Sequence, residues 1–233
     1  MMLSKVLTQL LAEFLGTFFF ILTIPLTYHG VGLLSPLPIG MMLSALCFAL
    51  RYISGAHFNP AITFAVFIIR EISSVRFIAY ILVQILAGLM AAIYLSLIRE
   101  PAIYLMEMNS DILIIWRLAF WEFVYVFSLT CTVLHASHSE QKVNDFYGIS
   151  IGMSFISAAF TSPAQFITFL NPAGIIGATL LDWFEGNPVD FRFFFVSLIA
   201  PMGGAFTGSI FYQILDTENH DRRRSPNHIR MVY

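Results

Sequence analysis

This chain of 233 residues is 58% hydrophobic and only 11% charged, and its formal net charge is −2. A soluble domain normally carries about 25% charged residues, so the composition excludes an ordinary soluble protein and predicts an integral membrane protein. The two cysteines, Cys47 and Cys131, lie in apolar runs, which argues against a disulfide framework. No Cys/His cluster in the sequence has the spacing of a metal site, so no metal or other cofactor is expected.

Six apolar runs are candidates for membrane-spanning helices, each of which needs roughly 20 residues. In chain order they are 7–28, 37–53, 76–98, 113–135, 147–160 and 193–215, of which the second and the fifth are short. The first run is too long for the apolar region of a signal peptide, lacks a small-residue cleavage site and contains Glu13. We therefore expect it to be a retained first span.

Two further apolar runs each follow the tripeptide Asn-Pro-Ala. The two copies are Asn59-Pro60-Ala61, between the second and third spans, and Asn171-Pro172-Ala173, between the fifth and sixth. Pro is favoured at the first position of a helix and Asn is a good N-cap, so each tripeptide predicts a helix start. The runs that follow, 62–69 and 174–181, are too short to cross a bilayer. They predict two half-helices that meet end to end inside the membrane.

The two halves of the chain repeat the same order of segments, which is span, span, half-helix, span. Asn59 of the first half corresponds to Asn171 of the second. In the same way, Glu13 in the first span corresponds to Glu122 in the fourth. An odd number of spans per half means that the second copy enters the membrane upside down. We therefore expect a first repeat at 1–110, an inverted second repeat at 111–215 and a polar, basic cytoplasmic tail at 216–233.

The distribution of positive charge predicts the orientation of the spans, because Lys and Arg favour the cytoplasmic side. With both termini in the cytoplasm, nine Lys and Arg residues lie inside and three lie outside. The same arrangement gives the outer loops an acidic character. We therefore expect a multi-pass protein with both termini cytoplasmic.

The stretches that lead into the half-helices predict a water-filled path. Residues 54–58 and 162–170 contain Gly and Pro and cannot be helical throughout. At membrane depth such backbone is tolerated only where it is buried in protein or lines a cavity. Two helix N-termini aimed at one point each place roughly half a positive charge there. With the amides of Asn59 and Asn171 as donors, such a site holds the oxygen of a neutral solute and opposes cations and protons.

With these features the chain resembles the aquaporin family, also called the major intrinsic proteins, over roughly residues 7–215. The resemblance is carried by the motif Ser-Gly-Ala-His-Phe-Asn-Pro-Ala at 54–61, the second Asn-Pro-Ala, the two intramembrane glutamates and a glycine-rich sixth span. It implies an all-α membrane protein with six transmembrane helices and two re-entrant half-helices in an inverted repeat. It also implies a pore through each monomer of a homotetramer.

The resemblance further implies roles for particular residues. Asn59 and Asn171 are expected to be the central donors, within the two Asn-Pro-Ala motifs. The carbonyl groups expected to line the pore belong to Gly55, Ala56 and His57 on the cytoplasmic side and to Ile167, Thr168 and Phe169 on the outer side. Glu13 and Glu122 are expected to be buried acceptors that brace the two re-entrant loops.

The outer filter departs from the family pattern. The usual arginine lies three residues after the second Asn, and that position here is Gly174. The other three filter positions correspond to Ile39, Ala159 and Thr168. A filter without charge, histidine or a large aromatic predicts passage of glycerol-sized neutral solutes, urea or ammonia beside water. The open alternative is that Phe166 or Phe169 fills the volume that the arginine vacates, because the loop lacks the family's usual glycine.

The sequence thus predicts a passive channel for water and small neutral solutes in a lipid bilayer. Two alternatives follow from the missing arginine: a cation-leaky channel, and a non-conducting structural or adhesive membrane protein whose pore is plugged by an aromatic ring. An enzyme is not expected, because the spans hold no nucleophile–His constellation and no phosphate-binding loop. Nothing in the sequence indicates a nucleic-acid partner.

Overall fold

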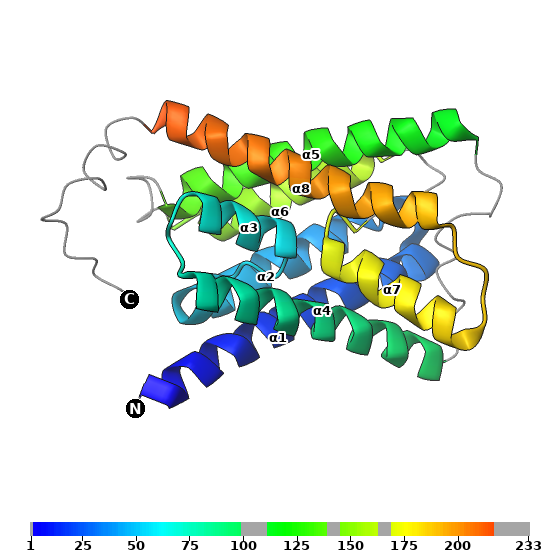
Figure 1. The fold of residues 1–233 in the computed structure, drawn as a ribbon, viewed down its shortest axis with the longest axis horizontal. Helices are drawn as coiled ribbons and strands as arrows, with labels where there is room; N and C mark the ends of the chain where they lie inside the picture. Colours follow the sequence, from blue (N-terminus) through cyan, green and yellow to red (C-terminus); the bar gives the residue numbers. More distant parts are fainter. Residues whose placement is uncertain (1, 99–110, 139–144, 163–168, 217–233) are drawn as a thin grey trace, which may run out of the picture.

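The computed structural model describes residues 2–98, 111–138, 145–162 and 169–216, and this part of the chain is entirely helical apart from its turns and loops (Figure 1). The described α-helices are α1 (Met2–Val31), α2 (Pro36–Ser54), α3 (Pro60–Ile68), α4 (Ser74–Leu97), α5 (Ile112–His138), α6 (Tyr147–Phe160), α7 (Pro172–Glu185) and α8 (Phe191–Leu215). A short 3₁₀-helix, η1 (Gly32–Leu34), joins α1 to α2. The predicted all-α fold class is confirmed.

Five stretches of the described chain are long and apolar enough to cross a bilayer. They are Lys5–Tyr28, Gly32–Ser54, Ser74–Leu97, Ile112–His138 and Phe191–Leu215. The fifth predicted span, α6, is apolar but has only 14 residues. It begins and ends at the predicted positions, because a turn precedes Tyr147 and the helix ends just before Thr161.

The two half-helices begin where the sequence predicts. Pro60 is the first residue of α3 and Pro172 is the first residue of α7, and the preceding asparagines are the N-caps. Figure 1 shows the long helices running roughly side by side, while α3 and α7 begin near the middle of the bundle and extend toward opposite ends. Helix α3 has nine residues and α7 has 14, so each is shorter than a spanning helix.

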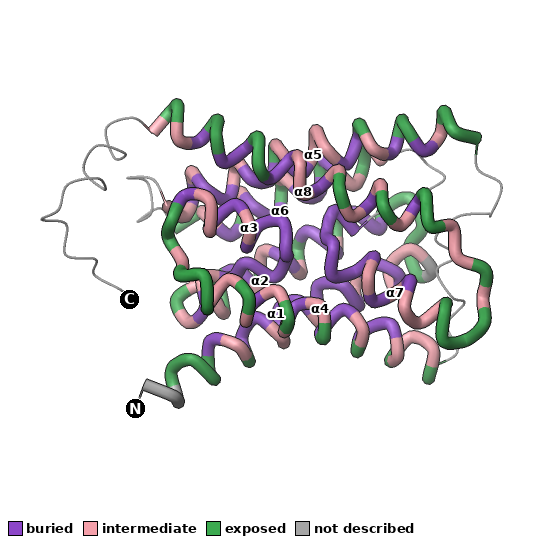
Figure 2. Tube along the Cα trace, in the orientation of Figure 1, coloured by how far each residue is buried: buried purple, intermediate pink, exposed green. Residues whose placement is uncertain are grey.

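Each half of the chain makes the same set of internal helix contacts. In the first half α1 packs against α2 and α4, and in the second half α5 packs against α6 and α8. Contacts between the halves join α2 to α6, α4 to α7 and α3 to α8. Figure 2 shows the buried positions concentrated where α3 and α7 begin and along the helix faces turned toward them. The first turns of the half-helices therefore lie in the core of the bundle.

Glycines allow the closest helix approaches between the two halves. An added Cβ at Gly40 of α2 would lie 2.6 Å from the carbonyl oxygen of Gly152 of α6. An added Cβ at Gly88 of α4 would collide with the carbonyl group of Ala173, in the second Asn-Pro-Ala motif. Small residues commonly permit such backbone contact between helices in membranes. The glycine at position 88 thus lets α4 support the beginning of α7.

The outward faces of the bundle carry large apolar side chains. Leu82 of α4, Phe120 of α5 and Ile199 of α8 are each more than half exposed. Large apolar side chains exposed on several long helices are typical of a protein that contacts lipid or another protein. The described helices therefore have a surface suited to a bilayer.

Candidate pore centre

The two asparagines cap the half-helices in the same way. The backbone N–H of Ala61 donates to Oδ1 of Asn59 at 2.8 Å, and the N–H of Ala173 donates to Oδ1 of Asn171 at 3.0 Å. Both asparagines have extended backbone, as N-cap residues commonly do. The side-chain oxygen is therefore used within each motif, and the amide nitrogen is turned toward other partners.

Each asparagine also reaches across to the opposite loop. Nδ2 of Asn59 donates to the carbonyl oxygen of Leu170 at 2.8 Å, and Nδ2 of Asn171 donates to the carbonyl oxygen of Phe58 at 2.8 Å. Each acceptor is the residue just before the other asparagine, and both acceptors have a positive φ, near 50°. Among the described residues, no acceptor takes the second N–H of either amide. The pair of bonds ties the N-termini of α3 and α7 together and leaves one donor on each side.

Glu13 of α1 holds the first loop in place. Its buried carboxyl group accepts four hydrogen bonds. Oε1 accepts from Oγ of Ser54 at 2.6 Å and from the N–H of His57 at 3.0 Å. Oε2 accepts from the N–H of Phe58 at 2.7 Å and from Nε2 of Gln84 at 2.8 Å. A carboxyl group inside a membrane protein is costly unless it is bonded, and these four donors offset that cost.

A second set of polar side chains joins this network from α3 and α4. Nε2 of Gln84 also donates to Oγ1 of Thr63 at 2.8 Å, and the same oxygen lies 3.2 Å from Nδ1 of His57. The hydroxyl of Tyr80 donates to the carbonyl oxygen of Ser54 at 2.8 Å. The loop between α2 and α3 is thus fixed from three helices.

The carbonyl groups of the first loop are left for other partners. The N–H groups of His57 and Phe58 face Glu13, and Gly55 and Ala56 have positive φ angles of 99° and 55°. In the described part of the chain, no group donates to the carbonyl oxygens of Gly55, Ala56 or His57. Carbonyl groups at this depth need a partner, and water or a solute in a path alongside them would serve.

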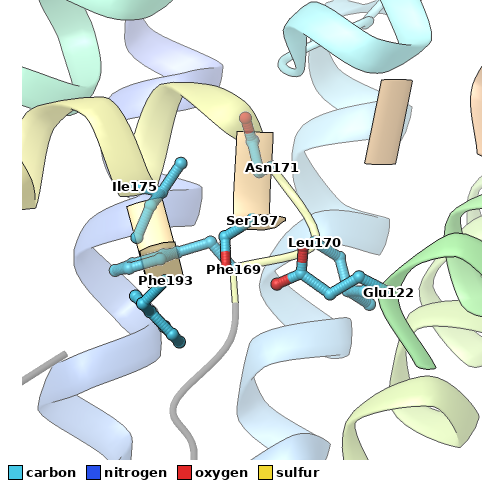
Figure 3. A pocket seen from close by; sticks show the side chains of 7 residues that line it. All are labelled: Glu122, Phe169, Leu170, Asn171, Ile175, Phe193 and Ser197. Carbon is cyan, nitrogen blue, oxygen red and sulfur yellow. The ribbon is translucent and has the colours of Figure 1, made fainter. Parts of the chain in front are cut away.

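Glu122 of α5 lies in a small pocket beside the second Asn-Pro-Ala motif (Figure 3). The pocket is lined by Glu122, Phe169, Leu170, Asn171, Ile175, Phe193 and Ser197. Glu122 is buried, and its Oε2 and Oγ of Ser197 have no hydrogen-bond partner among the described residues. The loop that Glu122 is expected to brace includes residues 163–168, among them Ile167 and Thr168, which lie outside the described residues.

The predicted filter positions are only partly described. Ile39 is buried near the start of α2, Ala159 is in the last turn of α6, and Gly174 is in the first turn of α7. The ring of Phe169 packs directly on Gly174: an added Cβ there would lie 2.5 Å from Cγ and Cδ1 of that ring. Phe166, the other aromatic residue considered for this volume, lies outside the described residues, as does Thr168.

Similarity to known proteins identifies the family of this chain. The family model described as Major intrinsic protein matches residues 2–212. The chain belongs to the major intrinsic protein family. It is similar to Aquaporin AqpM of Methanothermobacter thermautotrophicus, with 26% identity over 89% of this chain and 97% of the relative. It is also similar to the glycerol uptake facilitator protein-like 6 of Lactiplantibacillus plantarum, with 27% identity over 90% of this chain and 98% of the relative.

The fold agrees with that of a solved member of the family. The structure of the aquaglyceroporin from Plasmodium falciparum superposes with a TM-score of 0.74, at 18% identity, over 93% of this chain and 99% of that one. This major intrinsic protein therefore has the aquaporin fold, and it is an integral multi-pass membrane protein. The family assignment made from the motif at 54–61 and the second Asn-Pro-Ala is confirmed.

Sequence reasoning missed part of the polar network in this major intrinsic protein. It identified Glu13 but not Thr63, Tyr80 or Gln84, which hold the same loop. A signal was present, because Tyr80 and Gln84 are polar residues four positions apart within the apolar run 76–98. Residues at that spacing share one helix face, so the pair indicates a polar stripe turned into the protein.

Proposed function

We propose that this major intrinsic protein is a passive channel that conducts water and small neutral solutes such as glycerol. The observation that supports it most strongly is the reciprocal bonding of Asn59 to Leu170 and of Asn171 to Phe58. These bonds set two helix N-termini against each other in the interior of a membrane protein. They also leave one amide N–H on each asparagine for the oxygen of a passing solute.

The charge at this centre favours neutral solutes. The N-termini of α3 and α7 each carry roughly half a positive charge, which repels cations and protons. In the proposed centre, Pro60 and Pro172 start the helices, while Ala61 and Ala173 donate to the capping oxygens. An oxygen that approaches both asparagines therefore finds two donors and no acceptor from their side chains.

The carbonyl groups on either side of the centre complete the proposed path. On one side it includes Gly55, Ala56 and His57, whose carbonyl oxygens have no donor in the described chain. On the other side we assign the same role to Ile167, Thr168 and Phe169, by the correspondence between the two halves. A row of acceptors on each side of two central donors orients water and hydroxyl groups through hydrogen bonds.

Two glutamates and an uncharged filter complete the assignment. Glu13 holds the first loop through four hydrogen bonds, and we assign the equivalent role in the second loop to Glu122. The proposed filter consists of Ile39, Ala159, Thr168 and Gly174, none of which carries a charge. The similarity to a protein named as a glycerol uptake facilitator supports the inclusion of glycerol among the solutes.

We further propose that both termini are cytoplasmic and that the chain forms a homotetramer. The excess of Lys and Arg in the loops and tail on that side supports the orientation. The exposed apolar faces of the described helices can contact either lipid or neighbouring copies. Cross-linking in membranes and protease access to the tail would test the two statements separately.

The test is stopped-flow light scattering on proteoliposomes. An impermeant osmolyte should cause shrinkage faster than in protein-free vesicles, and a glycerol gradient should cause fast re-swelling. Shrinkage without re-swelling would restrict the proposal to water. Folded protein that accelerates neither process would contradict it.

The cation-leaky alternative has its own measurement. Conductance above background in planar bilayers would support it, and the absence of conductance would support the neutral-solute channel. The positive ends of α3 and α7 are present at the centre, so we expect no conductance.

A further inference from the structure

A phenyl ring covers the position at which this chain lacks a filter side chain. Gly174 is the third residue of α7, and the ring of Phe169 lies over its α-carbon. An added Cβ at position 174 would lie 2.5 Å from Cγ and Cδ1 of the ring and 2.9 Å from Cβ of Phe169. Cβ atoms do not approach other atoms this closely, so any larger residue at 174 would displace the ring.

The glycine at 174 is required by this contact and not by its backbone. Gly32, Gly55 and Gly186 are the described glycines with a positive φ, and Gly174 is not among them because it has helical geometry. Any L-residue can adopt that backbone. The ring of Phe169 therefore occupies the space that a side chain at position 174 would fill, and glycine at 174 leaves room for it.

The pore centre fixes the backbone next to this ring. Phe169 is followed by Leu170, whose carbonyl oxygen accepts the amide of Asn59, and then by Asn171, whose amide is bonded to Phe58. The ring itself is only 4% exposed. It lines the pocket that also includes Glu122 and Ser197, as Figure 3 shows, and it packs on Gly174.

We propose that Phe169 is a specificity-determining residue of the channel, in which its ring takes the place of a side chain at position 174 and sets the size limit for solutes. This inference rests on the proposed function. The ring is rigid and uncharged and offers no hydrogen-bond donor, so it discriminates by size and not by charge. A smaller residue at 169 lets larger solutes pass, because Gly174 supplies no side chain to fill the space that the ring vacates.

The experiment compares the permeability of proteoliposomes to erythritol and to glycerol, which differ by one hydroxymethylene group. Phe169→Ala should raise the erythritol-to-glycerol ratio by roughly tenfold, the scale on which a pocket distinguishes one such group. Phe169→Leu retains most of the volume and should change the ratio less. Phe193→Ala is the matched control, because Phe193 lines the same pocket from α8 but is not among the nearest atoms to Gly174.

An unchanged ratio in Phe169→Ala, or an equal rise in Phe193→Ala, overturns the proposal. Should Phe169→Ala fail to fold, Phe169→Val decides the question, because Val removes more of the ring volume than Leu does, and a ratio equal to that of wild type then contradicts the proposal. The contact between the ring of Phe169 and Gly174 is tested separately by thermal unfolding. Gly174→Ala should lower the unfolding temperature in the wild-type background, and should lower it less when residue 169 is Leu.

A failure of the proposed function would give a different result in the transport measurements. Folded wild-type protein that conducts neither water nor glycerol contradicts the channel proposal as stated. The assignment of Phe169 is then supported if Phe169→Ala creates conduction that wild type lacks, and it is refuted if that variant is closed as well.

Discussion

Nε2 of Gln84 in α4 donates a 2.8 Å hydrogen bond to Oε2 of Glu13 in α1, inside the bundle. The same nitrogen donates to Oγ1 of Thr63 in α3. One amide group therefore connects three helices to the carboxyl group that holds the first loop. Both Gln84 and Glu13 are completely buried, so neither can exchange its partner for bulk water.

Replacing Gln84 should destabilise the protein measurably. Gln84→Leu removes a donor to Glu13 and leaves Thr63 with fewer partners, and a buried polar group left unsatisfied costs about 1–3 kcal/mol. We expect a lower unfolding temperature in detergent for Gln84→Leu. Ser96→Ala is the control in the same helix, because it removes an exposed hydrogen bond to Glu185 and should change the unfolding temperature little. Equal stability of Gln84→Leu and wild type would contradict the role of the buried amide.

The two variants Glu122→Gln and Glu122→Leu should differ in yield of folded protein. Gln can still accept a hydrogen bond in the second loop, whereas Leu cannot, so Glu122→Gln should be the milder change. Fluorescence-detected size exclusion of both variants measures the folded fraction. If both lose folded protein to the same degree, Glu122 does not brace the loop through an accepted bond.

Asn171→Asp should weaken the barrier to cations. An aspartate can still accept the N–H of Ala173, so the cap of α7 survives, but it cannot donate to the carbonyl oxygen of Phe58. A carboxylate at the centre also offsets the positive ends of the half-helices and attracts cations. We expect conductance in planar bilayers that wild type does not give. Folded Asn171→Asp that remains electrically silent would argue against a pore at this position.

Gly88→Ala should disturb the second half-helix. The added methyl group would collide with the backbone carbonyl of Ala173, which cannot rotate away as a side chain can. Overpacking of this kind typically costs about 1–3 kcal/mol. Gly203→Ala of α8 is the matched control, because its Cβ would meet only the ring of Phe123, at 3.3 Å. The unfolding temperature of Gly88→Ala should be lower than that of Gly203→Ala. Similar unfolding temperatures for both variants would show that α4 tolerates a wider contact with α7.

Mercurials should not block the channel by direct plugging. Cys47 is buried in α2 and Cys131 is half-buried in α5, and neither belongs to the described pocket beside Asn171. We expect water permeability to persist after brief treatment with mercuric chloride. Fast block by mercury that remains in the Cys47→Ser and Cys131→Ser variants would contradict the assignment of the filter, because the block would then not come from either cysteine.

The sequence by itself determined the segments of this protein and its family. Long apolar runs and the two Asn-Pro helix starts depend on hydropathy and on caps formed within a few residues, so they are encoded locally. The motif at 54–61, together with the second Asn-Pro-Ala, the two intramembrane glutamates and the glycine-rich sixth span, identified the family.

Only the tertiary structure decided which groups meet. Gln84 reaches Glu13 from 71 positions away, and the amide of Asn171 reaches the carbonyl of Phe58 across 113. The sequence left Phe166 and Phe169 as alternatives for the space beside Gly174, and among the described residues it is Phe169 that packs there. Such contacts depend on how each helix is rotated and how closely its neighbours approach. Packing of the whole bundle sets those quantities, and no local pattern in the chain specifies them.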